Sequence, residues 1–306
     1  MKTKEPRTIA SAPSPGAAPA PTEIRKPRSY VACLREGMNF PLTHFGEIFR
    51  FLWPAALAVA VVDAVCKMLE TAIVVRGPLP MLSARSWVEI GLLELVAFVA
   101  AVVVTSQVVY QQRHLAEQGR LPGGRPWPAF RQSLSPFFRT LLCALFSVVV
   151  LLGAAAFFLA GALSRQPLWH VGGLALLFLL LCLTPAMLHY LYSRDGLSVA
   201  LRTPFWRYLG RTVAVLLLAL LACGLALFVV ALPYLLVSLI DMLVARQTAL
   251  GDILVLPTAF PLLRGVAIFL YVFLGIFVNL LLSYPLLYHW GACSAIEQER
   301  RQAGRA

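Results

Sequence analysis

TVAVLLLALLACGLALFVVALPYLLVSLI, residues 212–240, runs for 29 residues without a charged side chain. An α-helix rises about 1.5 Å per residue, so roughly 20 apolar residues cross the hydrocarbon core of a bilayer, which is about 30 Å thick. The stretch therefore predicts a membrane-spanning helix, and this decides the fold class.

Five further apolar blocks of comparable length lie along the chain, at 50–75, 87–110, 138–163, 168–192 and 262–290. The whole chain is 59% hydrophobic and 13% charged, whereas soluble domains average roughly 45–50% and about 25%. This composition excludes an ordinary soluble enzyme, a nucleic-acid module and a disordered scaffold. We expect an all-α, polytopic integral membrane protein with six transmembrane helices.

Pro233 lies inside the fifth block, about where a spanning helix would leave the membrane. Proline has no backbone N–H and disfavours a helix interior. We therefore expect the chain to leave the membrane near Pro233 and residues 234–256 to bend into an interfacial or re-entrant segment.

The chain divides by composition into three parts. Residues 1–28 form a basic tail rich in Pro and Ala, with too few large apolar groups to fold, so we expect it to be disordered. Residues 29–296 form the six-helix transmembrane domain, and residues 297–306 a short basic tail. No apolar region follows the basic start, so the first span should act as an uncleaved signal-anchor.

The basic residues give the orientation. With the N-terminus inside, the inner segments hold twenty of the 26 Lys and Arg residues, the outer loops hold five, and Lys67 lies within a span. The positive-inside rule then places both termini in the cytoplasm. The net charge of +12 is thereby explained by topology and contact with anionic lipids, without nucleic acid. The six tryptophans, including Trp290, lie at or beside span ends, as interfacial anchors do.

A basic, aromatic segment precedes each odd-numbered span, at 41–53, 129–142 and 201–217. Apolar residues recur two and five positions before Arg50, Arg139 and Arg211, as on one face of a helix. Helices of this kind lie in the headgroup plane. We expect three hairpins, each preceded by a cytoplasmic interfacial helix. The alternative is that these segments are only the basic, aromatic flanks that any span re-entering the membrane carries. The residues expected to contact lipid headgroups are Arg50, Arg139, Arg202, Arg207 and Arg211.

Residues 200–211 (ALRTPFWRYLGR) and 283–289 (SYPLLYH), with the segments before the odd spans, carry a resemblance. Over about residues 30–300 the layout resembles bacterial six-span proteins of the glycerophosphodiester phosphodiesterase membrane-domain type. The resemblance implies the interfacial helices and a location in the inner (cytoplasmic) membrane. It does not imply phosphodiesterase activity, because no soluble stretch is long enough for the catalytic barrel.

Ionisable residues occur inside the first predicted hairpin. Asp63, Lys67 and Glu70 share one face of the first span, and the second span carries Glu89 and Glu94. At about 1.5 Å per residue, Asp63 and Glu94 reach similar depths. We expect Asp63, Lys67 and Glu94 to form a polar intramembrane cluster. It is either a vestibule for an ion or polar headgroup, or an internally satisfied cluster that locks two helices together.

Catalytic signatures are missing from the sequence. It contains no phosphate-binding loop, dinucleotide fingerprint, zinc-protease motif or nucleophile elbow, and its cysteines and histidines have no ligand spacing. We expect no catalytic residue, metal or cofactor. His189 and Asn279 are expected to form hydrogen bonds between helices.

These observations favour a non-enzymatic multi-pass membrane protein that handles a lipid or polar solute, or supports a membrane assembly. The alternative is a scaffold subunit that docks a protein partner, a second copy of the chain or anionic lipid through its basic helices. A third reading, an intramembrane enzyme with Asp63 or Glu94 as its base, has no recognisable acceptor site.

Overall fold

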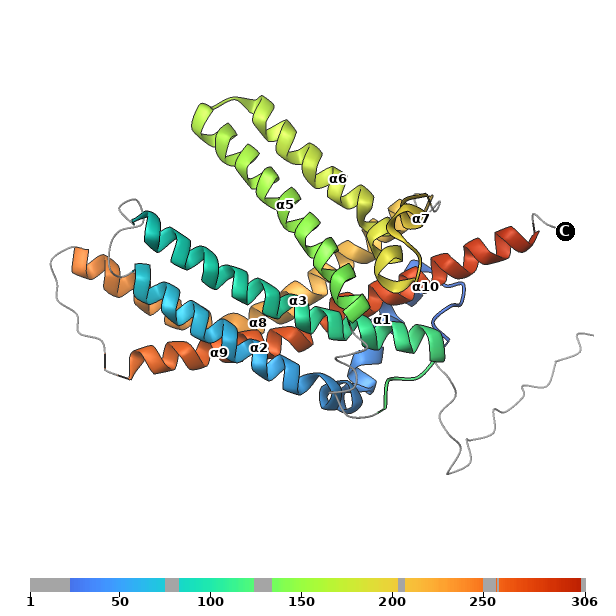
Figure 1. Ribbon diagram of the computed structural model, residues 1–306, viewed down its shortest axis with the longest axis horizontal. Helices are drawn as coiled ribbons and strands as arrows, with labels where there is room; N and C mark the ends of the chain where they lie inside the picture. The colour runs from blue at the N-terminus through green and yellow to red at the C-terminus, as the bar shows by residue number, and fades with distance from the viewer. Residues whose placement is uncertain are drawn as a thin grey trace, which may run out of the picture.

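The structure is a computed structural model that describes residues 23–74, 83–123, 134–202, 207–249, 257 and 259–303. These residues form helices and turns, with no strand among them (Figure 1). The prediction of an all-α protein is therefore confirmed. The described helices are α1 (Tyr30–Thr43), α2 (Phe45–Val74), α3 (Ala84–Gln118), α5 (Leu134–Ser164), α6 (Pro167–Tyr192), α7 (Leu197–Arg202), α8 (Leu209–Ala249), α9 (Phe260–Val278) and α10 (Leu280–Ala303).

Six helical stretches of the described chain are long and apolar enough to cross a membrane. They are α2, α3, α5, α6, α8 and the pair α9–α10, which together form one continuous helical stretch, Phe260–Ala303. Asn279 joins α9 to α10, and its backbone N–H donates to Gly275 O at 2.9 Å. The chain is thus a multi-pass membrane protein, and the six predicted spans each correspond to one of these stretches.

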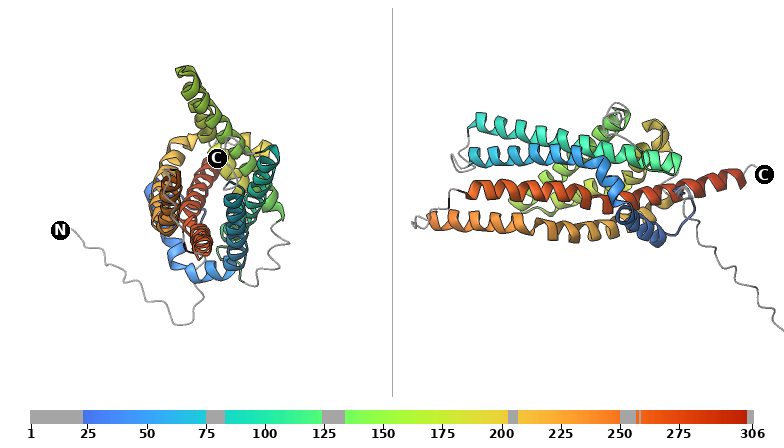
Figure 2. Two further views of the ribbon diagram at one scale, coloured as in Figure 1. Left: turned by 90° about the vertical axis from the view of Figure 1, so that its left-hand side faces the viewer. Right: turned by 90° about the horizontal axis from the view of Figure 1, so that it is seen from below.

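The helices form a bundle from which one hairpin diverges. Helices α2, α3, α8 and α9 run side by side, whereas α5 and α6 pack on each other and leave the bundle at an angle (Figures 1 and 2). Helix α1 and the last turns of α10 lie at one end, which we call the terminal end. Helix α2 ends, and α3 begins, at the opposite, distal end (Figure 1).

The core lies at the terminal end, around the first half of α10. Tyr284 and Leu287 have 0% exposure, because α1 packs directly against this helix. The approach is close: a Cβ atom added to Gly37 would lie 2.5 Å from Pro285 Cα. The described part of the predicted disordered tail joins this packing, since Ile24 is buried against Gly291. Ile24, which the sequence assigned to the tail, therefore belongs to the core.

The expected separate segment after Pro233 differs from the structure, in which residues 234–249 continue the helix of the fifth span. Helix α8 continues through Pro233 to Ala249. Neighbouring helices can hold such a helix together within a membrane, and α9 does so here. The ring of Tyr234 on α8 stacks on Tyr271 of α9 with centroids 5.6 Å apart. About two turns further along α8, Asp241 forms an ion pair with Arg264 of α9.

The segments expected to form separate interfacial helices also differ from that expectation in the structure. Their described parts mostly belong to spanning helices, since α2 begins at Phe45 and α5 at Leu134. Ile48, on the expected apolar face, has 0% exposure because it packs into the core cluster. Residues 297–303 of the short basic C-terminal tail form the last turns of α10, which continues to Ala303.

Candidate functional site

A cavity of about 450 Å³ lies within the bundle, between α2, α3, α9 and the start of α10. We call it the Asp63 cavity. Its lining is largely apolar and includes Val59, Val104 and Ile276. Its polar lining residues are Asp63, Thr105, Asn279 and Ser283.

The neutral polar residues of this cavity use their hydrogen-bond donors on their own helices. Thr105 Oγ1 donates to Ala101 O at 2.8 Å, and Ser283 Oγ donates to Leu280 O at 3.4 Å. Such back-bonding is common for Ser and Thr within helices. Their oxygen lone pairs remain available, so both hydroxyls act as acceptors toward any occupant.

Asn279 behaves in the same way at the junction of α9 and α10. Its Nδ2 donates to Gly275 O at 3.0 Å, and its Oδ1 accepts from Cys223 Sγ on α8 at 3.6 Å. The predicted interhelical contact of Asn279 is confirmed. One lone pair of Oδ1 and the second N–H of Nδ2 remain beyond these contacts, so Asn279 can accept or donate, whereas the Thr105 and Ser283 hydroxyls act as acceptors.

Asp63 is the ionisable side chain among the described residues that line this cavity. It is half-buried and forms no hydrogen bond or ion pair with another described residue. A charged side chain at the centre of a spanning helix costs about 2.5–3.5 kcal/mol on insertion scales. Such residues usually pair with one another or serve a function, so an unpaired carboxylate marks the cavity as a candidate site.

The other expected members of the cluster lie one turn further toward the distal end. Lys67 Nζ is 2.5 Å from Glu94 Oε1 and 3.0 Å from Glu70 Oε2. The structure thus brings Lys67 and Glu94 together and adds Glu70, which shares the face of Lys67 at i,i+3 spacing. Asp63 remains outside these ion pairs. Glu89, which the sequence places nearer the distal end, pairs with Arg85 at 2.9 Å.

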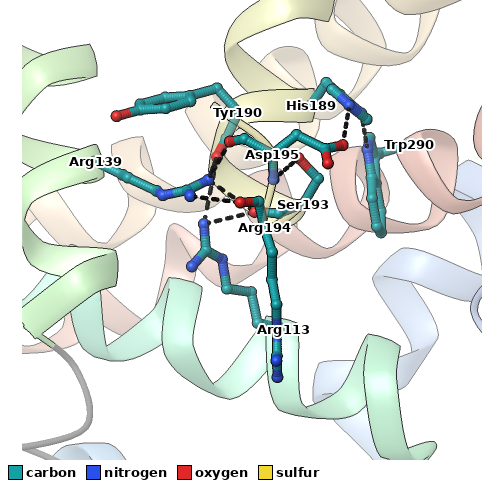
Figure 3. Close-up of polar contacts among 8 residues, drawn as sticks. All are labelled: Arg113, Arg139, His189, Tyr190, Ser193, Arg194, Asp195 and Trp290. Carbon is teal, nitrogen blue, oxygen red and sulfur yellow. Dashed lines mark hydrogen bonds and ion pairs between the residues drawn. The ribbon is translucent and has the colours of Figure 1, made fainter. Parts of the chain in front are cut away.

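At the terminal end, Arg139 holds the end of α6 (Figure 3). Its Nη1 donates to Tyr190 O, Ser193 O and Asp195 O at 2.8–2.9 Å, and its Nη2 donates to Arg194 O at 2.9 Å. The last carbonyls of a helix have no intrahelical donor, and Arg139 supplies one. The guanidinium expected to contact lipid headgroups is thus directed at backbone carbonyls.

Arg113 on α3 reaches the same carbonyls from the other side (Figure 3). Its Nε donates to Leu191 O at 2.5 Å, and its Nη2 donates to Ser193 O at 3.0 Å. In addition, Arg194 donates to both carboxylate oxygens of Glu117 on α3, at 2.9 and 2.7 Å, which raises the pKa of Arg194. These contacts fasten the base of the α5–α6 hairpin to the bundle.

Of the other four arginines expected to contact lipid headgroups, the structure describes the side chains of three. Arg50, Arg207 and Arg211 are exposed and form no ion pair with another described residue. The side chain of Arg202 lies outside the described part of the chain. Three of the five residues are therefore free to contact lipid.

Trp290 differs from its expected place at the membrane interface. It is only 3% exposed, and its Nε1 donates to His189 Nδ1 at 3.3 Å (Figure 3). The predicted interhelical hydrogen bond of His189 is thereby confirmed. His189 Nε2 lies 3.0 Å from Asp195 Oδ2, a contact across the end of a helix that no periodic pattern reveals.

Sequence reasoning also missed the role of Arg113, because this residue follows the predicted end of the second span at residue 110. A signal was present, because no helix-ending residue follows Tyr110 until Gly119. Gly119 caps α3 with a φ of 68°. The helix therefore had to carry Arg113 on a regular face, next to the fully buried Gln112.

Comparisons of the chain with protein-family models, curated proteins and solved structures found no match. Among the described residues, no group of three His, Cys, Asp or Glu side chains is placed to hold a metal ion. The functional argument therefore rests on the geometry of the Asp63 cavity and of the terminal end.

Proposed function

We propose that this multi-pass membrane protein binds a small cationic solute, a monovalent metal cation or a protonated amine, in the Asp63 cavity. One observation carries the proposal: the Asp63 carboxylate lines an intramembrane cavity and forms no ion pair with a described residue. A cation in the cavity supplies the missing countercharge.

The neutral lining supports the same ligand class. The Thr105 and Ser283 hydroxyls donate to backbone carbonyls, so they offer oxygen acceptors to the cavity. Oxygen acceptors around one carboxylate suit hard cations and ammonium groups. A volume of about 450 Å³ lies within the usual range for small-molecule sites, about 300–1,000 Å³.

The proposed role is binding or transfer of the solute, without catalysis. General acid–base or nucleophilic chemistry needs a second reactive group within hydrogen-bond reach. Among the described lining residues, no second titratable side chain lies beside Asp63, and the Thr105 and Ser283 hydroxyls donate to backbone carbonyls of their own helices. A junction between two helices at the cavity, here Asn279, is also a feature of solute sites in membrane transporters.

The test compares thermal stability of the purified full chain in detergent across a panel of chloride salts at constant ionic strength. The panel contains Li⁺, Na⁺, K⁺, NH₄⁺ and methylammonium, with choline as the reference cation. A ligand at 100 times its Kd stabilises the folded state by about 2.7 kcal/mol. We expect at least one cation of the panel to raise the Tm of the native chain.

Two variants locate the effect. Asp63→Asn should abolish the cation-dependent rise in Tm, because it removes the countercharge from the cavity. Glu89→Gln is the matched control, since it removes a carboxylate that is paired with Arg85 outside the cavity. A rise that persists in Asp63→Asn, or that Glu89→Gln also removes, contradicts the proposal.

We also propose that the terminal end faces the cytoplasm of the inner membrane and contacts anionic lipid. The exposed, unpaired side chains of Arg50, Arg207 and Arg211 support this contact. Each basic residue near an anionic surface contributes about 1 kcal/mol of attraction, and salt screens it. Docking of a protein partner on the same basic surface is the competing proposal, and co-purification from native membranes distinguishes the two.

A further inference from the structure

A second cavity, of about 380 Å³, lies at the terminal end between the end of α6, α7 and the last turns of α10. It shares no lining residue with the Asp63 cavity, and we call it the terminal cavity. Its polar lining residues are His189, Asp195, Ser294, Glu297, Gln298 and Arg301.

Glu297 provides the first sign of a missing ligand. Its side chain is 14% exposed, and its Oε2 is buried without a hydrogen-bond partner among the described residues. Its Oε1 lies 3.9 Å from Arg301 Nε, which is beyond the length of a hydrogen bond. A buried carboxylate oxygen without a donor is unfavourable, so the terminal cavity lacks a donor at this position.

Asp195 adds a second carboxylate with a fixed position (Figure 3). The Trp290 indole N–H can only donate, so His189 Nδ1 accepts its hydrogen bond and His189 Nε2 carries the ring proton. That proton is donated to Asp195 Oδ2 at 3.0 Å. The imidazole is therefore neutral, and it orients the Asp195 carboxylate without cancelling its charge.

The other polar side chains complete the pattern. Ser294 Oγ donates to Gly291 O at 2.8 Å, so it too offers only lone pairs. Arg301 is the cationic residue among the described lining residues, and its side chain is 64% exposed. The cavity therefore presents the carboxylates of Glu297 and Asp195 as acceptors, of which Glu297 is the more buried, and the Gln298 amide and the Arg301 guanidinium are exposed beside them. A guanidinium is well suited to bind phosphate.

Helix α7 indicates what surrounds the terminal cavity. Its side chains Leu197, Val199 and Leu201 are 44%, 49% and 44% exposed, and Val199 also lines the cavity. Leu197 and Leu201, four residues apart, share the face of α7 opposite to Val199, and exposed apolar side chains on one face suit a helix at the membrane interface. A headgroup at that level would meet the terminal cavity through the Val199 face.

We propose that the terminal cavity binds a phosphoethanolamine group, supplied as the headgroup of a membrane lipid. The ammonium donates hydrogen bonds to Glu297 Oε2 and to the Asp195 carboxylate, and the phosphate meets Arg301. A choline headgroup has no N–H to donate, and a glycerol headgroup has no cation. The proposal is independent of the function assigned to the Asp63 cavity.

The experiment measures lipid binding to the full chain by native mass spectrometry. Detergent micelles are doped at equal mole fraction with dioleoyl phosphatidylethanolamine, phosphatidylcholine or phosphatidylglycerol. We expect phosphatidylethanolamine to bind at least tenfold more tightly than phosphatidylcholine and phosphatidylglycerol. Equal affinity for the ethanolamine and choline lipids overturns the proposal.

Variants connect this selectivity to the cavity. Glu297→Gln should reduce the preference for phosphatidylethanolamine about tenfold, and Asp195→Asn, at a more exposed site, should reduce it in the same direction. Glu299→Gln is the matched control, because Glu299 is exposed on the same helix and does not line the cavity. If Glu297→Gln fails to fold, Asp195→Asn decides alone. Unchanged selectivity in a folded cavity variant overturns the proposal.

Soluble phosphoethanolamine distinguishes the two sources of the same chemistry. As a competitor it should displace the lipid only at concentrations far above the lipid Kd, because it lacks the acyl chains that hold a lipid at the interface. A Kd for soluble phosphoethanolamine as low as that of the lipid assigns the cavity to a free solute and overturns the lipid assignment.

Discussion

Asp63 and Lys67 lie one helical turn apart on α2, yet their surroundings differ. Lys67 is held between Glu70 and Glu94, whereas Asp63 faces a cavity and has no ion-pair partner among the described residues. The ion pair of Lys67 with Glu94 therefore joins α2 to α3, and Asp63 lies outside it. Of the two alternatives drawn from the sequence, the lock describes Lys67 and Glu94, and the vestibule corresponds to the site that we propose at Asp63.

The lock predicts non-additive stability effects of Lys67→Met and Glu94→Gln. Lys67→Met alone leaves two carboxylates side by side without their ammonium, so the double variant should be milder than the sum of the single ones. We expect a coupling free energy of about 0.5–3 kcal/mol from a double-mutant cycle. The measurement is thermal or chemical unfolding in detergent.

A second cycle, of Lys67→Met with Asp63→Asn, serves as the control. It should show a smaller coupling, because Asp63 forms no ion pair with Lys67. A larger coupling with Asp63 than with Glu94, or strict additivity in the Glu94 cycle, contradicts this assignment of partners.

Helical spacing could predict that Lys67 and Glu70 share one face of α2, and their ion pair confirms this prediction. It could not predict the choice of partner, because that choice depends on where α3 presents Glu94 and on how the flexible Lys67 side chain is directed. Asp195 escaped prediction for a similar reason: it meets His189 around the end of α6, where the helical period no longer applies.

At the scale of elements, the packing of α1 on α10 was the least predictable feature. Residues 30–43 carry no long apolar run, and their burial follows from tertiary contact with Tyr284 and Pro285. The spanning helices were predictable because their apolar length is a local property of the sequence. Pro233 misled the prediction because its effect depends on α9, which packs along the following turns.

The contact of α1 with α10 predicts that Gly37→Ala destabilises the fold. The added Cβ would lie 2.5 Å from Pro285 Cα and 2.6 Å from Pro285 N, so backbone must move. Overpacking of this kind typically lowers stability by about 1–3 kcal/mol. The free energy of unfolding in detergent measures the effect.

Gly46→Ala is the matched control, because a Cβ added to Gly46 meets nothing within 4 Å. Alanine is the better helix former by up to about 1 kcal/mol, so this variant should be as stable as the native chain or more stable. Equal stability of the two variants means that α1 and α10 do not approach as closely as described.

At the scale of the whole molecule, the divergence of the α5–α6 hairpin stands out (Figures 1 and 2). Arg113 and Arg139 join its base to α3 and to the segment after α6. Its outer part exposes apolar side chains such as Val149, Leu152 and Phe178. The surface that a bilayer must cover is therefore larger than that of a closed bundle.

The arrangement predicts one topology. Fusions to a reporter that fluoresces only in the cytoplasm should be bright after residue 125 and at the C-terminus, and dark after residues 80 and 250. Twenty of 26 basic residues lie on the side assigned to the cytoplasm, which favours this orientation. Bright reporters at 80 together with dark ones at 125 mean that the orientation is reversed.

The central claim is that the Asp63 carboxylate makes its cavity selective for cations. It is tested most directly by labelling Ser283→Cys with methanethiosulfonate reagents of opposite charge and measuring the rate at residue 283 by mass spectrometry. Ser283 lines the cavity, and a focused negative field should favour the cationic reagent by about tenfold or more. Adding Asp63→Asn should remove the preference and leave the two rates alike. Equal rates in the presence of Asp63, or a preference that survives Asp63→Asn, contradict the account.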